Sequence, residues 1–459
     1  MGQLFVSRPV DGQPRRAAVI GAGIAGLSAA IALRRAGWHV IVYEKSQFKN
    51  EIGAAITITP NATLVLERLG FDFSEFGGVP NELLLRYDAA DLSLLQKDYY
   101  GPDSGAEWSR FWSVHRVDLH NGLRKLAIQQ KGGIPGPPAD VKLGHEITGV
   151  DCETGRVDLK DGRREQYDLV VIADGAHSRL IEDFTGKPST VHRTGRSIYR
   201  WLVSMADVNA DPVLQKLYAD PEGSGKSGFV AWVDKENRIL WVSYKCRGGK
   251  VLNNAVVHDT QTGEGEEDLW QSPVSREQVL RVLRNFHPSV QKMVSMTAED
   301  GIKAHHLYKR EPLASFVRGK TLVMGDAAHV MMPTHAAGAS VAIETAATLE
   351  TLFDFSGLVE KDTWTMDRRL EMFDKLRVPR CNLAMLSSNA GPEWLHVPGV
   401  EDEIRKYYSG PLPPAGAMPY SSAFRDVLFK HDEYRAARDC MDKTAKAFAG
   451  RDGKETEDK

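Results

Sequence analysis

The stretch RRAAVIGAGIAGLSAAIALRRAGWHVIVYEK, residues 15–45, decides the fold class. A short apolar run leads into a glycine-rich turn, small residues then recur at helical spacing, and a second β-type run ends at Glu44. This order predicts a strand, a tight turn, a helix and a second strand. The chain therefore begins with a βαβ unit, the building block of a parallel sheet.

The glycines of this turn have the spacing of a dinucleotide-binding site. Gly21 permits the tight turn, Gly23 lets a pyrophosphate approach the backbone, and Gly26 lets the helix pack closely. Glu44 follows at the position that accepts hydrogen bonds from ribose hydroxyls, which favours FAD or NAD over NADP. The alternative is a glycine-rich turn that serves helix packing alone.

Composition excludes several other classes of protein. The 459 residues are 42% hydrophobic and 26% charged, with a formal charge of −3 and no basic block that would attract nucleic acid. The four cysteines are far apart, so neither a zinc ribbon nor a disulfide framework is expected. No apolar run approaches the length of a membrane span, and no signal-type segment leads the chain. We expect a cytoplasmic monomer or homodimer that binds no nucleic acid and spans no membrane.

The remaining sequence predicts one discontinuous nucleotide-binding domain with a second domain inserted in it. Buried β-type runs that end in Asp-Gly or Gly-Asp recur at residues 166–179 and 319–329, which assigns residues 14–80, 110–185 and 300–360 to the first domain. Apolar and polar residues alternate in 81–109 and 186–299, as in an antiparallel sheet that would bind the substrate. Residues 361–445 are expected to be helical, and the charged segment 446–459 to be a disordered tail.

The stretch GDAAHVMMPTHAAG, residues 325–338, carries one carboxylate and two imidazoles. His329 and His335 are six residues apart with Pro333 between them, which does not suit a zinc site on a helix, and we expect no metal. The chain has no GxSxG motif, so a serine hydrolase is not favoured. What remains is a strand end, a loop and a helix start near Gly338 whose free amides suit an electron-rich flavin ring.

Five segments together resemble the single-component FAD-dependent aromatic hydroxylases, the family of p-hydroxybenzoate and salicylate hydroxylases. They are residues 21–45, GAAITITPNATLVLERLG, SVHRVDL, VVIADGAHS and GDAAHVMMPTHAAGASVAIE. The resemblance covers about residues 15–390. It implies an α/β fold with a Rossmann-like FAD-binding domain, an inserted antiparallel β-sheet substrate domain and C-terminal helices.

The resemblance also implies which residues hold the cofactor. Adenosine would lie on the Gly21 loop and Glu44, Arg116 would reach the phosphates or ribose, and Asp326 would bind the ribityl chain. The complete set of implied FAD contacts is Gly21, Gly23, Gly26, Glu44, Ala55, Arg116, Asp174, Gly175, Asp326, Pro333, Gly338 and Ala339. Three positions depart from the family pattern: Ile181 replaces an arginine that contacts the nicotinamide dinucleotide, Thr345 replaces an aspartate, and Ala55 replaces a frequent glycine.

By this resemblance the chain is an NAD(P)H-dependent FAD monooxygenase that hydroxylates a phenolic acid or related secondary metabolite with O2, through a flavin C4a-hydroperoxide. Arg200 is expected to hold a carboxylate or phenolate, His335 to accept a phenol proton, and Tyr244 to contact the ring. The alternatives are a surface strand arginine paired with an acid for Arg200, a structural histidine for His335 and a packing role for Tyr244. Simple, decarboxylative and dearomatising hydroxylation, and NADPH or NADH as co-substrate, stay open. The alternatives are an epoxidase or reductase of an isoprenoid or alkene, and a non-catalytic FAD-binding scaffold.

Overall fold

The predicted βαβ unit forms the centre of a parallel sheet. The computed structural model describes residues 14–48, 54–100, 110–130, 134–261, 272–355, 364–391, 394–418 and 420–455. Strand β1 (Arg16–Ile20), helix α1 (Ile24–Arg35) and strand β2 (His39–Glu44) follow one another as expected. In the described residues their sheet has the order β19-β20-β12-β1-β2-β8, all parallel except β19. The other members are β8 (Asp140–Leu143), β12 (Leu169–Ile172), β19 (Val317–Arg318) and β20 (Thr321–Val323).

Helices bury one face of this sheet. Helix α1 packs against α3 (Arg116–Ile128) and α10 (Ala337–Leu352), and α10 packs in turn against α2 (Pro60–Leu69) and α11 (Met366–Ala390). The strands β1 and β12 are fully apolar where they are buried, as expected for a parallel sheet covered by other elements. Small side chains along α1 and α10 allow the close approach between the two helices.

The inserted domain is an eight-stranded sheet with the order β17-β18-β13-β16-β15-β14-β5-β6 in the described residues. Every pairing is antiparallel except β5 with β14, which is parallel, so the expected antiparallel sheet is mixed at one edge. Its strands are β5 (Leu83–Asp88), β6 (Leu94–Tyr99), β13 (His192–Ser204), β14 (Gly228–Asp234), β15 (Ile239–Cys246), β16 (Val251–Asp259), β17 (Ser272–Pro273) and β18 (Lys303–Lys309).

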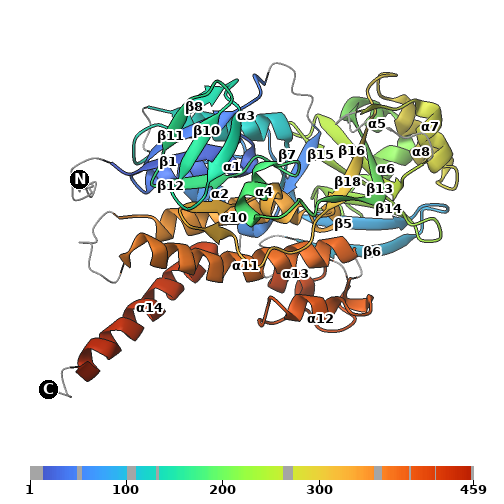
Figure 1. The fold of residues 1–459 in the computed structure, drawn as a ribbon. Coiled ribbons are helices and arrows are strands. Elements are labelled where there is room, and N and C mark those ends of the chain that lie inside the picture. Colours follow the sequence, from blue (N-terminus) through green and yellow to red (C-terminus); the bar gives the residue numbers. More distant parts are fainter. Residues whose placement is uncertain are drawn as a thin grey trace.

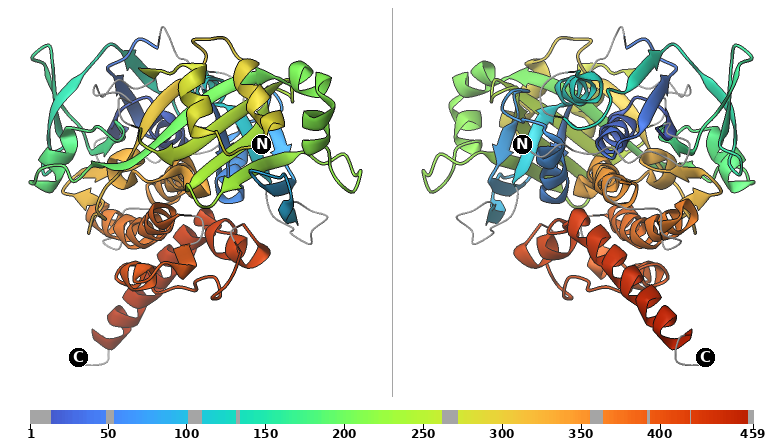
Figure 2. Two further views of the ribbon diagram at one scale, coloured as in Figure 1. Left: turned by 90° about the vertical axis from the view of Figure 1, so that its right-hand side faces the viewer. Right: turned by 90° about the vertical axis from the view of Figure 1, so that its left-hand side faces the viewer.

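Strand alternation sorts the aromatic residues of this sheet between its two faces. Tyr199, Trp201, Trp232 and Trp241 are almost fully buried in one hydrophobic cluster. That face is covered by α5 (Met205–Ala210), α6 (Pro212–Leu217), α7 (Arg276–Val282) and α8 (Pro288–Ser295), which lie on the outer side of the sheet in Figures 1 and 2. Because successive side chains point to opposite faces, the other face is free to meet the nucleotide-binding domain.

Two smaller sheets and a group of C-terminal helices complete the described part of the fold. The strands β3 (Ala55–Ile58) and β4 (Val79–Asn81) pair with β7 (Phe111–His115), and β9 (Ile147–Asp151), β10 (Arg156–Leu159) and β11 (Arg164–Gln166) form a separate antiparallel sheet that packs against α4 (Leu180–Thr185). The chain closes with α12 (Val400–Arg405), α13 (Ser422–Leu428) and α14 (Glu433–Glu455).

Two expected boundaries differ from the structure. Strand β18 belongs to the eight-stranded sheet, so that domain extends beyond residue 299, because β18 pairs with β13 along its edge. Charge predicted a disordered tail from residue 446, whereas α14 continues as one helix to Glu455 and projects from the body in Figure 1. No helix in the described ranges is long and apolar enough to cross a membrane.

Candidate active site

A cavity of about 490 Å³ lies between the nucleotide-binding domain and the open face of the eight-stranded sheet. Its first wall carries the glycine loop, residues near the end of β20 and the start of α10. Its second wall comes from the sheet and carries mainly apolar side chains, among them Leu84, Phe229, Leu240, Val242 and Val257. A largely apolar pocket between domains with a few polar groups is the usual form of a small-molecule site.

Each of the three glycines in the first loop occupies its position for a different structural reason. Gly21 has φ +102°, and a Cβ there would lie 2.5 Å from the Ala173 carbonyl oxygen. At Gly26 a Cβ would lie 1.9 Å from the Gly21 oxygen, so this glycine allows α1 to begin against the strand. Beyond its own neighbours in the chain, no described residue has an atom within 4 Å of a Cβ built on Gly23, which lines the cavity. Gly23 is thus not required by packing within the chain, and the space above it suits a ligand backbone contact.

Glu44 lies beside this loop as expected. Its carboxylate oxygens accept from the backbone amides of Ala22, at 2.8 Å, and Ser46, at 2.7 Å. These bonds fix the carboxylate at the end of β2, next to the amino terminus of α1. A carboxylate oxygen has a further lone pair, so both can still accept from ribose hydroxyls.

The other expected cofactor residues converge on the same wall. Arg116 begins α3 and Asp326 begins α9 (Asp326–His329), and both side chains line the cavity. Enclosure by the protein raises the pKa of Asp326, while Arg116 opposes that shift. Pro333, Gly338 and Ala339 line the cavity as well.

A left-handed residue sets the direction of α10. Ala336 has φ 52° between the short turn Pro333–His335 and the first residue of the helix. Non-glycine residues adopt this conformation at a cost, and such positions cluster at functional sites. The turn brings the amino-terminal residues of α10 to the cavity.

Asp174 and Gly175 follow β12 at the edge of the same site. Gly175 has φ +90° and lines the cavity, and apart from its chain neighbours no atom in the described part of the chain lies within 4 Å of a Cβ built there. Burial raises the pKa of Asp174 to about 6, and its Oδ1 is a buried acceptor with no hydrogen bond to the described residues. Ile181, which replaces the family's arginine, is packed in the core, and Arg179 nearby is exposed.

Ala55 links the two walls. Its amide donates to Asn253 Oδ1 and its carbonyl accepts from the Tyr244 hydroxyl, each at 3.0 Å. Tyr244 comes from β15 of the eight-stranded sheet and lines the cavity. Burial raises the pKa of Tyr244, so its hydroxyl stays protonated and its proton is committed to Ala55.

Arg200 faces the cavity from β13. Burial lowers the pKa of its guanidinium, and Arg116 adds to that effect, whereas Tyr244 opposes it. Among the described residues that line the cavity, Asp326 is the only carboxylate, and it belongs to the opposite wall. The cavity therefore offers Arg200 no carboxylate from its own wall.

His335 does not reach this site. Its side chain is fully buried, its Nδ1 lies 3.3 Å from the Ser388 hydroxyl of α11, and its ring packs against Tyr420 and Phe424. The neighbouring residues Thr334 and Ala336 line the cavity, but His335 does not. The expectation that His335 accepts a substrate proton is therefore not supported, because the short turn directs its ring toward the C-terminal helices.

Several polar residues of the cavity were not anticipated, among them Arg86, Gln96, His305 and His306. Burial, followed by the nearby Arg200 and Arg116, lowers the pKa of His305 to about 4, so this imidazole is neutral near pH 7. His305 pairs with Ile198 across β13 and β18. Only this strand pairing, which local patterns do not specify, brings it beside Arg200.

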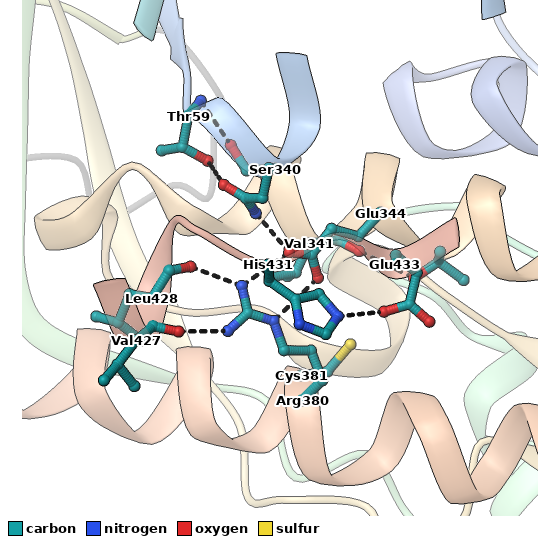
Figure 3. Close-up of polar contacts among 12 residues, drawn as sticks. Thr59, Ser340, Val341, Glu344, Arg380, Cys381, Val427, Leu428, His431 and Glu433 are labelled. Atoms are coloured by element: carbon teal, nitrogen blue, oxygen red, sulfur yellow. Dashed lines mark hydrogen bonds and ion pairs between the residues drawn. The ribbon is translucent and has the colours of Figure 1, made fainter. Parts of the chain in front are cut away.

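A buried ion network supports the first wall from behind (Figure 3). Glu344 of α10 is paired with Arg377 at 3.0 Å and Arg380 at 2.8 Å, both from α11, and Arg377 also pairs with Glu433 of α14. Thr345 keeps a contact at the position where the family has aspartate, since its hydroxyl accepts from Arg377 Nε at 3.2 Å.

Glu344, His431 and Glu433 also have the proximity that a metal site needs. Both carboxylates are already paired with guanidinium groups, and His431 Nε2 lies 2.7 Å from Glu433. Their charge is thus compensated within the chain.

The residues of the first wall fit FAD. Gly23 and Gly175 leave space where a Cβ would otherwise stand, Glu44 can accept from a ribose, and Asp174 Oδ1 is a buried acceptor without a partner in the described chain. These are the groups that a dinucleotide with ribose hydroxyls and a pyrophosphate requires.

Comparison with known proteins agrees with this fit. Residues 15–202 match the family described as pyridine nucleotide-disulphide oxidoreductase, and residues 135–355 match the FAD binding domain. Hispidin-3-hydroxylase of Neonothopanus nambi is 31% identical over 81% of this chain and 86% of its own length. The FAD-dependent monooxygenase cfoG of Aspergillus candidus is 30% identical over 91% of this chain and 92% of its own.

A solved salicylate hydroxylase in complex with its substrate has the same fold, with a TM-score of 0.71 and 20% identity over 93% of this chain and 98% of its own. This chain, which carries the glycine loop, the inserted sheet and the cavity between them, thus aligns with these proteins over most of its length. This protein belongs to the single-component FAD-dependent monooxygenases of the aromatic hydroxylase type.

Proposed function

We propose that this monooxygenase hydroxylates an electron-rich phenol that carries an anionic oxygen, with NADPH or NADH as the reductant. The observation that carries the proposal is the Arg200 guanidinium, which faces an apolar cavity whose only described carboxylate lies on the opposite wall. A half-buried cation that faces an apolar cavity is stabilised by an anionic ligand. When bound, FAD would be reduced by the nicotinamide and would then activate O2.

The remaining cavity residues have roles that follow from their chemistry. Arg200 binds the phenolate or carboxylate and favours the ionised phenol, which makes the ring more nucleophilic. Tyr244 is a positioning residue, because its proton is held by Ala55 and its oxygen can accept from a substrate hydroxyl. His305, neutral near pH 7, is a further acceptor for a hydroxyl proton. The apolar side chains of the sheet exclude water from the reacting ring.

On the first wall, we assign the cofactor contacts to the glycine loop, Glu44, Arg116, Asp326 and the segment that begins α10. Gly23, Arg116, Asp326 and the start of α10 line one side of the cavity, and Glu44 is held beside the glycine loop by the Ala22 amide, which supports this assignment. Epoxidation of an alkene is less well supported, because a neutral hydrocarbon offers Arg200 no compensating charge. A non-catalytic scaffold would not need an enclosed cavity opposite the cofactor wall.

Anaerobic stopped-flow spectroscopy tests the proposal. NADH or NADPH is mixed with the FAD-loaded enzyme, with and without a panel of hydroxybenzoates, and the loss of flavin absorbance is followed. We expect at least one phenol to accelerate reduction strongly and to give a hydroxylated product in air. Reduction that is equally fast with every ligand, or absent, would overturn the hydroxylase assignment.

Arg200→Met tests the anion contact. A hydrogen bond to a charged group contributes about 1.5–3 kcal/mol, so the Kd of the best hydroxybenzoate should rise about 10–150-fold. Arg196→Met is the matched control: Arg196 lies on the same strand but pairs with Asp259 and does not line the cavity. An unchanged Kd in Arg200→Met would contradict the assignment.

A further inference from the structure

One row of residues crosses the cavity face of the eight-stranded sheet. The pairings place Arg200 of β13 opposite Ala255, Ala255 opposite Val242, Val242 opposite Ala231, and Ala231 opposite Arg86 of β5. Gln96 of β6 follows Arg86 in the same row. All six residues line the cavity, so their side chains share one face.

The guanidinium groups of Arg200 and Arg86 lie on this row with only small or apolar residues between them. Arg200 and Arg86 are four strand intervals apart, and neighbouring strands lie about 4.8 Å apart, so their Cα atoms are separated by roughly 19 Å. Side chains stand roughly perpendicular to a sheet, so the two charged groups do not converge on one point. The residues between them are small or apolar, which leaves room for a flat molecule along the row.

The far end of the row is polar and enclosed. Strand β6 is the edge of the sheet opposite β17 in the strand order, and β5 lies next to it (Figure 1); Arg86, Gln96 and Tyr420 of the C-terminal region all line the cavity. Burial raises the pKa of Tyr420, and the positive charge of Arg86 opposes the shift, which indicates that the two groups are close. The Tyr420 hydroxyl donates to the Thr334 carbonyl and so closes this end beside the cofactor wall.

We propose that Arg86 forms a second anion subsite for the far end of an elongated phenolic substrate. The Gln96 amide, which donates one hydrogen to Asp98 Oδ2 at 2.6 Å, offers its other hydrogen to the anion, and Tyr420 closes that end of the cavity. The far end carries a carboxylate or an ionised acidic hydroxyl, while the reacting ring is held at Arg200. This rests on the proposed function, since the ring is placed by the same Arg200 contact. A one-ring hydroxybenzoate reaches only one of the two cations, whereas a two-ring or longer conjugated phenol reaches both.

The test measures binding to the oxidised FAD-loaded enzyme, through changes in flavin absorbance or tryptophan fluorescence, and needs no turnover. The probes are a resorcinol-type stilbene with a para-carboxylate on its second ring and the matching para-carboxamide, which has the same shape without the charge. We expect the carboxylate to bind about tenfold more tightly than the carboxamide.

Arg86→Met should reduce this ratio to about one, and Arg86→Lys should retain most of it. Lys97→Met is the control, because Lys97 neighbours Gln96 on β6 but points away from the cavity and pairs with Glu222, and its ratio should equal that of the native enzyme. A native ratio near one, or a ratio unchanged by Arg86→Met, would overturn the second subsite.

The result is separable from the proposed function. Failure of every phenol to accelerate flavin reduction refutes the hydroxylase proposal, whereas loss of the carboxylate preference at Arg86 alone concerns only the far subsite. Arg200→Met should weaken the binding of both probes by the same factor and leave the ratio of their affinities unchanged. Unequal effects on the two probes would contradict the assignment of Arg200 and Arg86 to separate subsites.

Discussion

Glu344→Gln removes one charge from the buried network behind the cofactor wall. The native carboxylate accepts from Arg377 and from both Arg380 Nε and Nη2, and Asn61 also donates to it. Burial alone would raise the pKa of Glu344, but the positive charges of Arg380, His431 and Arg377 outweigh it and lower the pKa, so the group is ionised in the native protein. The amide of glutamine keeps the shape and leaves two buried guanidinium groups with one carboxylate.

Breaking one partner of a buried ion pair costs about 3–5 kcal/mol. The unfolding entropy of a chain of 459 residues is about 1 kcal/mol/K, so the Tm should fall by about 3–5 °C. Because Glu344 lies on α10, whose first residues line the cavity, release of FAD should occur at the same lower temperature.

Differential scanning calorimetry of the FAD-loaded protein, with flavin fluorescence recorded in parallel, measures both quantities. Glu277→Gln is the control, since its partner Arg281 is exposed and such pairs contribute only about 0–1 kcal/mol. A Tm for Glu344→Gln within about 1 °C of the native value would refute the reasoning. In the double variant Glu344→Gln/Arg380→Met, the fall in Tm should be smaller than the sum of the falls in the two single variants, because each single substitution already breaks the Glu344–Arg380 pair.

Three further results are expected. Gly23→Ala should keep the native Tm without FAD but weaken FAD binding in a fluorescence titration, whereas Gly26→Ala should lower the Tm itself, because its Cβ would meet the Gly21 oxygen; equal behaviour of the two variants would contradict this. Asp326→Ala should lose FAD during purification, and a full flavin content in its absorbance spectrum would argue against the ribityl contact. His329→Leu should make the stability of the fold less sensitive to acid. Burial lowers the pKa of His329 to about 3, so as the pH falls below about 6.5 this histidine takes up a proton in the unfolded state but not in the folded state. The free energy of unfolding of the native protein then decreases by about 1.4 kcal/mol per pH unit. Thermal melts at pH 7 and 5 should show the native Tm falling further than that of the variant, and parallel shifts would exclude this cause.

The cofactor half of the site was predictable because its signals are local. The glycine spacing, the acid at the end of the second strand and the Gly-Asp strand ends each lie within a short stretch, and parallel strands bring their carboxyl ends to one edge. The assignments of strand, turn and helix over residues 16–44 are confirmed, as is the FAD-binding fold. The mixed pairing of β5 was not predicted, since it depends on the distant strand β14, and the continuation of α14 was not predicted from its charge.

The sequence alone determined the βαβ start, the alternation of the inserted sheet and the family, because these depend on spacing that short segments carry. The tertiary structure decided which polar groups share the substrate cavity. The short turn at Pro333–His335 directs His335 away from it, while strand register brings His305 beside Arg200 and aligns Arg86 with Arg200 across four intervening pairings. Register is set by burial of one face of the whole sheet, so no single strand specifies which side chains will meet across it.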